Sequence, residues 1–238
     1  AEDRADRLAS AALVKALRDR QRAVRVEAAL GLARSGARAD EDIAHILAGA
    51  LDEENWARAE EIITVLVRMG PTAERALIPL IGLRSGDEAG RRRRVRAVEA
   101  VGRLGSAAAV SLLRGLYGST DTTLRFAAVK ALAGIGPSDA RSFAHFLSDP
   151  HPTIRFRAAE ALVRRRALDP ELAIRLLGDD DSHVRSLAAS AVRSDLAAAL
   201  PSLKRAASHC GAPVEGVTAR LRLWLHACAL IAAAGRAT

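Results

Sequence analysis

Histidine and cysteine are the side chains of this sequence that could coordinate a metal ion. The chain has six histidines and two cysteines, and four of these zinc-type ligands lie near its end: His209, Cys210, His226 and Cys228. His226 and Cys228 are two residues apart in a predicted helix and point about 160° away from each other, which disfavours joint coordination of one ion. We therefore predict no metal site and no cofactor.

The two cysteines are also too far apart for a disulfide. We expect Cys210 to end one helix and Cys228 to lie about fifteen residues along the antiparallel return helix, ~20 Å away at ~1.5 Å per residue. They give no indication of an oxidising compartment, and no signal peptide or membrane span is visible, so we expect a cytoplasmic protein. Residue 1 is Ala and Met69 is the only methionine, so we expect a processed chain or a piece of a longer one.

No arrangement of catalytic residues stands out. The sequence has no Ser-His-Asp order, no glycine-rich phosphate loop and no pair of carboxylates placed for acid–base catalysis. Glu60–Glu61 and Asp179–Asp181 are more simply interpreted as a solvated helix face and a turn. We predict that the protein is not an enzyme.

The chain is strongly basic, with a formal net charge of +8 and a pI near 10.7. Arginine dominates, as is typical of high-GC bacterial genomes, and only three basic residues are lysines: Lys15, Lys130 and Lys204. The densest basic runs are Arg91–Arg94 with Arg96, and Arg164–Arg166. Their side chains spread around predicted helices, and no base-stacking aromatic residues lie between them, so nucleic-acid binding is not expected.

These residues belong to a sequence that repeats. A pattern that is clearest from Leu124 to Gly136 recurs with starts at residues 24, 58, 93, 124, 154 and 184. A fixed period of this length is typical of a solenoid of stacked helical hairpins. In a helix, positions 1, 5, 8, 9 and 12 of each copy share one small apolar face. A shorter apolar-periodic segment precedes the copies, so each pair is predicted to form one hairpin.

We predict an all-α fold, a right-handed α-solenoid of about seven hairpins that forms one domain over residues 1–238. The predicted hairpins span residues 5–34, 41–69, 72–104, 106–135, 138–166, 169–194 and 196–234. Aromatic residues make up only 3% of the chain, so the core is expected to consist of Ala, Leu and Val. Such a core favours closely packed helices over a sheet.

The pattern Val/Leu/Ile-Arg-x-x-Ala-Ala-x-Ala-Leu-x-x-Ile-Gly, with turns such as Ser148–Pro152, resembles HEAT repeats, and most closely the short bacterial type of phycobilin lyase subunits. The resemblance covers nearly the whole chain and implies a scaffold or adaptor, although a few members of the family are enzymes. HEAT-like deoxyhypusine hydroxylases bind a di-iron centre through His-Glu pairs, and no such pair occurs here. The copy at residue 58 departs most from the pattern, with Arg58 and Glu60–Glu61 in place of apolar and Ala residues.

Arginine recurs at position 2 of five copies, after turns that carry aspartates. The arginines are Arg25, Arg94, Arg125, Arg155 and Arg185, and the turn residues are Asp19, Asp87, Asp121, Asp149 and Asp179–Asp181. We expect each arginine to pair with acidic groups of its own or a neighbouring turn, which would help to set the register between repeats. A row of phosphate contacts is the alternative.

In HEAT arrays the second helix of each hairpin lines the concave surface, and positions 3, 7 and 10 lie opposite the core face. The predicted partner-binding groove combines apolar residues at position 3 with charged residues at positions 7 and 4: Val26, Val95, Phe126, Phe156, Glu99, Lys130, Glu160 and Arg157. Apolar anchors with flanking charges suit a partner peptide or helix. The alternative is that the position 3 side chains pack against the next repeat.

The last predicted helix, residues 221–234, is apolar on all sides, although a terminal repeat needs a polar outer face. We predict that Trp224 and Leu230 form a terminal docking face for a partner or a second copy; the alternative is that alanine-rich sides tolerate exposure. The predicted function is a non-enzymatic protein–protein interaction scaffold whose partner is unknown. The alternatives are a subunit of a phycobilin lyase-type enzyme and a nucleic-acid-binding HEAT-like protein such as an alkylpurine glycosylase.

Overall fold

The computed structural model describes residues 2–35, 40–83, 86–136, 140–209 and 229. This part of the chain forms twelve α-helices and four short 3-10 helices and contains no strand, which confirms the all-α prediction. Contacts between Cα atoms divide the chain into two compact units, Ala1–Pro137 and Ser138–Thr238, and each is described by itself. The single domain over residues 1–238 stays a prediction.

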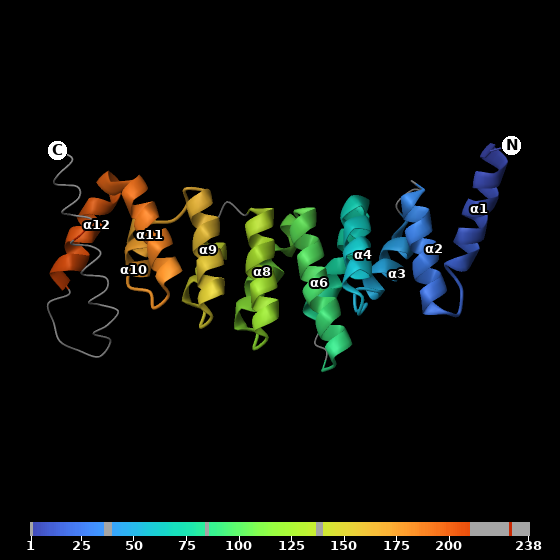
Figure 1. Cartoon of the computed structure of the whole chain (residues 1–238), viewed down its shortest axis with the longest axis horizontal. Helices are drawn as coiled ribbons and strands as arrows, with labels where there is room; N and C mark the ends of the chain where they lie inside the picture. Colours follow the sequence, from blue (N-terminus) through green and yellow to red (C-terminus); the bar gives the residue numbers. More distant parts are fainter. Residues whose placement is uncertain (1, 36–39, 84–85, 137–139, 210–228, 230–238) are drawn as a thin grey trace. The chain divides into compact units, whose positions relative to one another are not determined.

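The first unit is a double layer of helices. Its second helices, which contain the repeat copies, lie side by side in chain order (Figure 1): α2 (Arg22–Arg34), α4 (Trp56–Met69), α6 (Glu88–Leu104) and α8 (Thr122–Ile135). The first limbs of the hairpins pack against them: α1 (Glu2–Ala16), α3 (Glu41–Gly49), α5 (Pro71–Gly82), and the series η1 (Ala107–Ala109), α7 (Val110–Gly115) and η2 (Leu116–Gly118). Each second helix therefore contacts its own first limb and the neighbouring second helices.

Local sequence explains where the second helices start and end. Asn55, Asp87 and Asp121 precede α4, α6 and α8, and each side chain accepts a hydrogen bond from a backbone N–H of the first turn. Gly105 and Gly136 follow α6 and α8 in the left-handed region, with φ of 75° and 73°, where a Cβ would be strained. Capping at both ends makes each copy a discrete helix.

The repeat pattern corresponds to the buried face. In α8, Leu124, Ala128, Ala131 and Leu132 occupy positions 1, 5, 8 and 9 of the copy, and all are buried. Burial extends beyond this stripe, because Val129 at position 6 is also fully buried. A helix that packs against both a first limb and a neighbouring second helix has to bury more than one stripe.

The closest packing in the first unit joins α6 and α8. A Cβ added to Gly102 would lie 2.6 Å from the Cα and Cβ of Ala131, and one added to Gly134 would lie 3.1 Å from the carbonyl oxygen of Gly102. Small residues therefore allow the two backbones to approach. Gly102 is position 10 of its copy, which was predicted to face the groove but is buried here, because α8 covers it.

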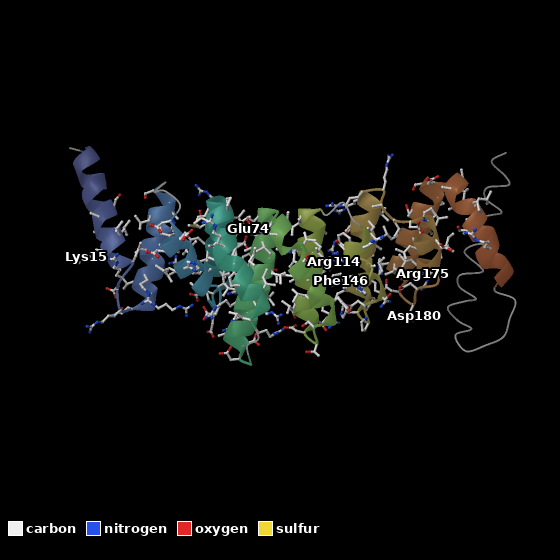
Figure 2. The ribbon with its side chains drawn as sticks, turned by 180° about the vertical axis from the view of Figure 1, so that it is seen from behind. Lys15, Glu74, Arg114, Phe146, Arg175 and Asp180 are labelled. Carbon is white, nitrogen blue, oxygen red and sulfur yellow. The ribbon has the colours of Figure 1, made fainter. Side chains whose placement is uncertain are left out.

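The second unit contains α9 (Pro152–Arg164), α10 (Pro170–Leu176), α11 (Ser182–Ser194) and α12 (Leu196–His209). The first limb of its first hairpin is not an α-helix but two 3-10 turns, η3 (Ala140–Ser142) and η4 (Phe146–Ser148). Phe143, in the turn between η3 and η4, and Phe146, at the start of η4, are both fully buried (Phe146 is labelled in Figure 2). The short limb thus buries two large rings without a full helix.

In the cap that follows α9, an arginine takes the left-handed conformation that glycine takes after α6 and α8. Arg166 has a φ of 53°, and the N–H groups of Arg166 and Ala167 donate to the carbonyls of Val163 and Leu162. This is the hydrogen-bond pattern of a Schellman cap, with Arg166 in the position that glycine usually occupies. The preceding residues Arg164 and Arg165 place cations at the negative end of the helix dipole.

The Gly102 contact can be tested by adding one methyl group. We expect Gly102→Ala to lower the free energy of unfolding by about 1–2 kcal/mol, because the clash with Ala131 outweighs the gain in helix propensity. Gly115→Ala is the matched control, since no atom lies within 4 Å of its added Cβ; it should be neutral or slightly stabilising. Urea denaturation measures both, and a G102A protein as stable as wild type would contradict the close packing of α6 and α8.

Candidate functional site

The position 2 arginines bind the backbone of the turn before their own helix. Nη1 of Arg25, Arg125, Arg155 and Arg185 donates to the carbonyl six residues earlier in the chain, at 2.8 Å in every case. The same nitrogen also donates to the carbonyl five residues earlier, at 2.8–3.5 Å. Identical offsets give identical geometry, so these arginines close the turn that joins the two limbs of a hairpin.

The predicted pairing with carboxylates is confirmed for Arg155, which also binds Asp179 of a neighbouring turn at 2.7 and 2.8 Å. The carbonyl oxygens of the arginine's own turn are partners that the sequence did not predict. The hydrogen bonds that Arg155 donates to Asp179 raise the pKa of Arg155. Arg94 does not bind the carbonyls five and six residues earlier but donates to the carbonyl of Ile81 at 2.7 Å. The reason is that α6 begins one turn earlier, relative to its repeat copy, than the other second helices.

The turn before α4 is closed differently. Position 2 of that copy is Ala59, whose side chain has no hydrogen-bond donor. Arg96 of α6 donates instead to the carbonyls of Leu51, at 2.9 Å, and Glu53. Asp52 in this turn binds Arg22 of α2 and, at 2.7 Å, Arg93 of α6. Cations from both neighbouring repeats therefore replace the arginine that this copy lacks.

Asp52 is held as a carboxylate. Burial alone would raise the pKa of Asp52, but hydrogen bonds from Arg22 and Arg93, together with their charges, hold it below its ordinary value. The Asp52 side chain is only 10% exposed. A carboxylate this enclosed needs the opposite charges of both Arg22 and Arg93. Because these arginines belong to the first and third repeats, Asp52 links the first three repeats.

The unusual residues of the copy at 58 form ion pairs between second helices. Arg58 pairs with Glu27 of α2 and, at 3.0 Å, with Glu61 of its own helix. Glu61 also pairs with Arg34 of α2, and Glu60 pairs with Arg103 of α6. The charged residues that replace apolar ones in this copy therefore connect it to the repeats on either side.

The densest basic run is engaged in contacts within the first unit. Arg92 donates to the carbonyl of Asp52 and pairs with Glu54, while Arg91 pairs with Glu88 and Asp121. Arg93, Arg94 and Arg96 have the carboxylate and carbonyl partners given above. These contacts support a structural role for the run rather than a row of phosphate contacts.

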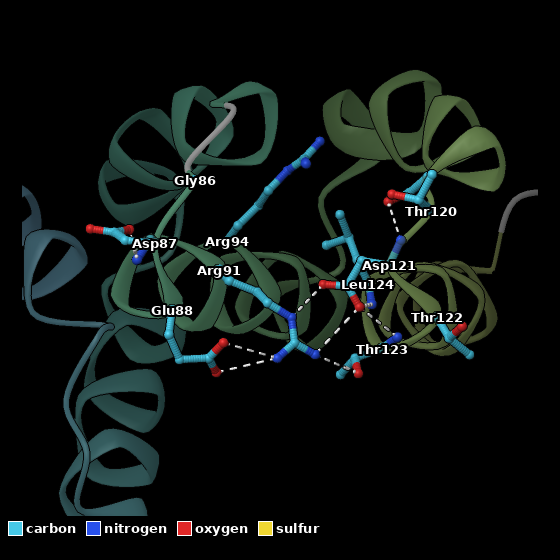
Figure 3. A pocket seen from close by; sticks show the side chains of 12 residues that line it. Gly86, Asp87, Glu88, Arg91, Arg94, Thr120, Asp121, Thr122, Thr123 and Leu124 are labelled. Carbon is cyan, nitrogen blue, oxygen red and sulfur yellow. Dashed lines mark hydrogen bonds and ion pairs between the residues drawn. The ribbon is translucent and has the colours of Figure 1, made fainter.

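A cleft of about 590 Å³ lies between the N-terminal ends of α6 and α8 (Figure 3). Arg91 bridges it: its Nε donates to Asp121 at 2.7 Å, its Nη1 to Glu88 at 3.2 Å and its Nη2 to the hydroxyl of Thr123 at 3.0 Å. Asp121 also accepts the backbone N–H groups of Thr123 and Leu124. The Arg94 side chain points away from this cluster.

The Asp121 carboxyl group in the cleft is not placed to act as a general acid. Burial would raise the pKa of Asp121, but Arg91 and the backbone N–H groups hold it below its ordinary value, so the carboxyl group has no proton to give at neutral pH. The lining residues include no histidine, cysteine or lysine. The cluster connects the third and fourth repeats as Asp52 connects the first three.

The predicted groove residues fall into two classes. In the first unit, Val95, Glu99 and Phe126 are half-buried and Lys130 is exposed, whereas Val26 is only 8% exposed. Val26 thus exposes little surface, as the alternative for position 3 expects, and the groove stays a prediction. On α9 of the second unit, three further residues keep exposed surface: Phe156, Arg157 and Glu160.

Other predicted sites lie outside the described residues. These include Trp224 and Leu230 of the terminal docking face, and Cys210, His226 and Cys228. The described part of the chain holds no cluster of three or more His, Cys, Asp or Glu side chains placed for a metal. None of its helices combines the length and the apolar character needed to cross a membrane.

Sequence reasoning missed Asp52 and the ion pairs of α4. The signal in the sequence was a departure from the repeat: the copy at 58 lacks the position 2 arginine and has charged residues at positions that are apolar in other copies. Those departures mark the places where neighbouring repeats supply the missing partners. These contacts could have been predicted from Arg92, Arg93 and Arg96. The three arginines are not at position 2 of their copy, so they have no turn of their own hairpin to close.

The turn-closing arginines should be essential for stability. Arg125 is 8% exposed, and we expect Arg125→Met to lower the free energy of unfolding by about 2–3 kcal/mol, because the methionine keeps the bulk but leaves buried carbonyls without a donor. Arg114→Met on α7 (Figure 2) is the matched control, since Arg114 is exposed and makes no hydrogen bond or ion pair among the described residues; it should change stability by less than about 0.5 kcal/mol. Equal effects in thermal or urea denaturation would refute the role of Arg125.

Acid should remove the contribution of Asp52. Its pKa is lowered in the folded state, so its stabilising effect is fully present above the unfolded pKa of about 4 and is lost as the pH falls through the lower folded value. We expect Asp52→Asn to cost about 2 kcal/mol at pH 6 and much less at pH 3. The control Asp42→Asn alters an exposed side chain that makes no ion pair among the described residues. A D52N deficit that stays constant between pH 6 and pH 3 in urea denaturation would rule out this linkage.

Comparison with known proteins confirms the repeat type over part of the chain. Residues 93–162 match a family model described as HEAT repeats. No curated protein matches the sequence. Among solved structures, the complex of CpcE and CpcF of phycocyanin lyase from Nostoc sp. PCC7120 aligns with a TM-score of 0.46 at 18% identity, over 89% of this chain and 92% of that chain. An engineered protein aligns with a TM-score of 0.49 at 19% identity, over 95% and 72% of the two chains.

Proposed function

We propose that this protein is a non-enzymatic scaffold that binds a peptide segment of a partner protein on the second helices of its repeats. In the first unit the binding surface is the exposed face of α6 and α8. The observation that carries the proposal is the half-exposed state of Val95 and Phe126, which occupy the same position in neighbouring copies. Val26 at that position is buried, so exposure is not a general property of position 3.

Exposed apolar residues on a capped and well-packed helix contribute little to the fold. The core of α8 is supplied by other positions, such as Leu124, Ala128 and Leu132, which are buried. A half-exposed Phe126 beside them keeps apolar surface in water, and such surface commonly marks a protein-binding site. In the second unit, Phe156 on α9 has the same position and a similar exposure.

The surface chemistry supports a protein partner over nucleic acid. The second helices of the first unit carry carboxylates next to arginines, as in Glu27–Arg58 and Glu60–Arg103. A phosphate backbone needs unpaired cations on one face, and carboxylates repel it. The lyase-type alternative requires room for a large apolar ring system, whereas Leu124 is the only large apolar residue among the charged, hydroxyl and glycine residues that line the cleft between α6 and α8.

Selection from a displayed library of random 15-residue peptides tests the proposal. We expect wild type to select peptides whose affinity falls about 30-fold or more for Phe126→Glu, the equivalent of about 2 kcal/mol at a binding anchor. Leu112→Glu is the matched control, because Leu112 is an exposed apolar residue on α7, in the first limb of the same hairpin. It should leave binding unchanged.

Two results would overturn the proposal. One is a set of selected peptides that bind F126E as tightly as wild type. The other is a Phe126→Glu protein that unfolds, which would make Phe126 a core residue. Tight, salt-dependent binding of a labelled oligonucleotide would favour the nucleic-acid alternative instead.

A further inference from the structure

Most charged side chains on the second helices of the first unit already have partners. On α2 and α4 the ion pairs are Arg22–Asp52, Glu27–Arg58 and Arg34–Glu61. On α6, Arg91–Arg94 and Arg96 bind carboxylates or carbonyls, and Arg103 binds Glu60. A charge without a hydrogen bond or ion pair is therefore an exception on this layer.

Three charged side chains are such exceptions among the described residues of these helices: Arg68, Glu99 and Lys130. Arg68 lies in the last turn of α4, where the helix dipole stabilises a cation. Glu99 feels the charge of Arg103 but makes no hydrogen bond or ion pair. Lys130 is exposed on α8 and has no partner in the described part of the chain. The fold gives no reason for these last two charges.

Glu99 and Lys130 lie next to the proposed apolar anchors. Glu99 follows Val95 by four residues on α6, and Lys130 follows Phe126 by four residues on α8. Residues four apart share one face of a helix. Each helix therefore presents an apolar side chain and, one turn along, a single charge, and the two charges have opposite sign on the two helices.

We infer that the partner segment on α6 and α8 presents an apolar side chain to Val95 and Phe126, a cation to Glu99 and a carboxylate to Lys130. This inference rests on the proposed function and names the chemistry of the partner. Apolar contact supplies most of the affinity, while the charges at the edge select the orientation of the segment. A segment that lies in the reverse direction would bring like charges together, which disfavours it.

The opposite charges of Glu99 and Lys130 also exclude a partner segment whose charges all have the same sign. A polyanion would gain from Lys130 but lose against Glu99 and the Glu60 carboxylate of the neighbouring helix, and a polycation would face the reverse problem. A segment with one acid and one base around an apolar residue satisfies both charges. Because the segment has mixed charge, its binding should depend only moderately on salt.

A charge exchange tests the inference. In the variant Glu99→Lys with Lys130→Glu the net charge is unchanged and the apolar anchors are untouched. Displayed 15-residue peptides selected on wild type should carry an apolar residue between an acid and a base, and should bind the exchanged variant about tenfold more weakly. Synthetic peptides with their own acid and base exchanged should regain that affinity for the variant. The control Asp42→Lys with Arg114→Glu exchanges exposed charges on the first limbs and should have no effect.

The outcomes separate this inference from the proposed function. Peptides that lose affinity with Phe126→Glu but not with the charge exchange would overturn the inferred partner chemistry and leave the binding surface in place. Peptides that are insensitive to both changes would overturn both. Selected peptides of a single charge sign would also contradict the inference.

Discussion

The hydrogen bonds from arginine to the turns between limbs are the interaction on which the rest of the structure depends. Each hairpin must reverse direction through a short turn whose carbonyls have no helical partner, and a buried carbonyl without a donor is costly. A guanidinium has five donors in a rigid plane, so one nitrogen can satisfy two carbonyls while the others reach a neighbouring repeat. Arg155 does both, because it closes its own turn and binds Asp179 of the next.

This use of arginine accounts for part of the basic character of the chain by structural contacts. Arg125 and Arg155 are largely enclosed, and their donors are occupied by the backbone and by carboxylates. Where a copy lacks its own arginine, as at Ala59, neighbouring repeats supply it, and the Asp52 turn then becomes the point at which three repeats meet. Several of the arginines of the chain are thus explained by how its turns are closed.

Charged side chains that connect the repeats can be distinguished from those that are available to a ligand, because the former have hydrogen-bond or ion-pair partners within the protein. The ion pairs of α4 engage Glu27, Arg58 and Glu61, so these three charges are not available to a ligand. On α6 and α8 the close backbone approach at Gly102 requires small residues instead, and Glu99 and Lys130 make no hydrogen bond or ion pair among the described residues. The proposed binding surface depends on these two charges and on the partly exposed Val95 and Phe126.

The sequence by itself determined the all-α class, the copies that become second helices, their caps and the core face of residues such as Leu124 and Leu132, because these follow from helical period and local hydrogen bonding. Only the tertiary structure decided which oxygen each arginine binds, that Phe143 and Phe146 are buried from a limb without an α-helix, and that Val26 is buried while Phe126, at the same position, is not. Helical period fixes which residues share a face. It does not fix how far a neighbouring helix extends over that face, which depends on the side chains of both.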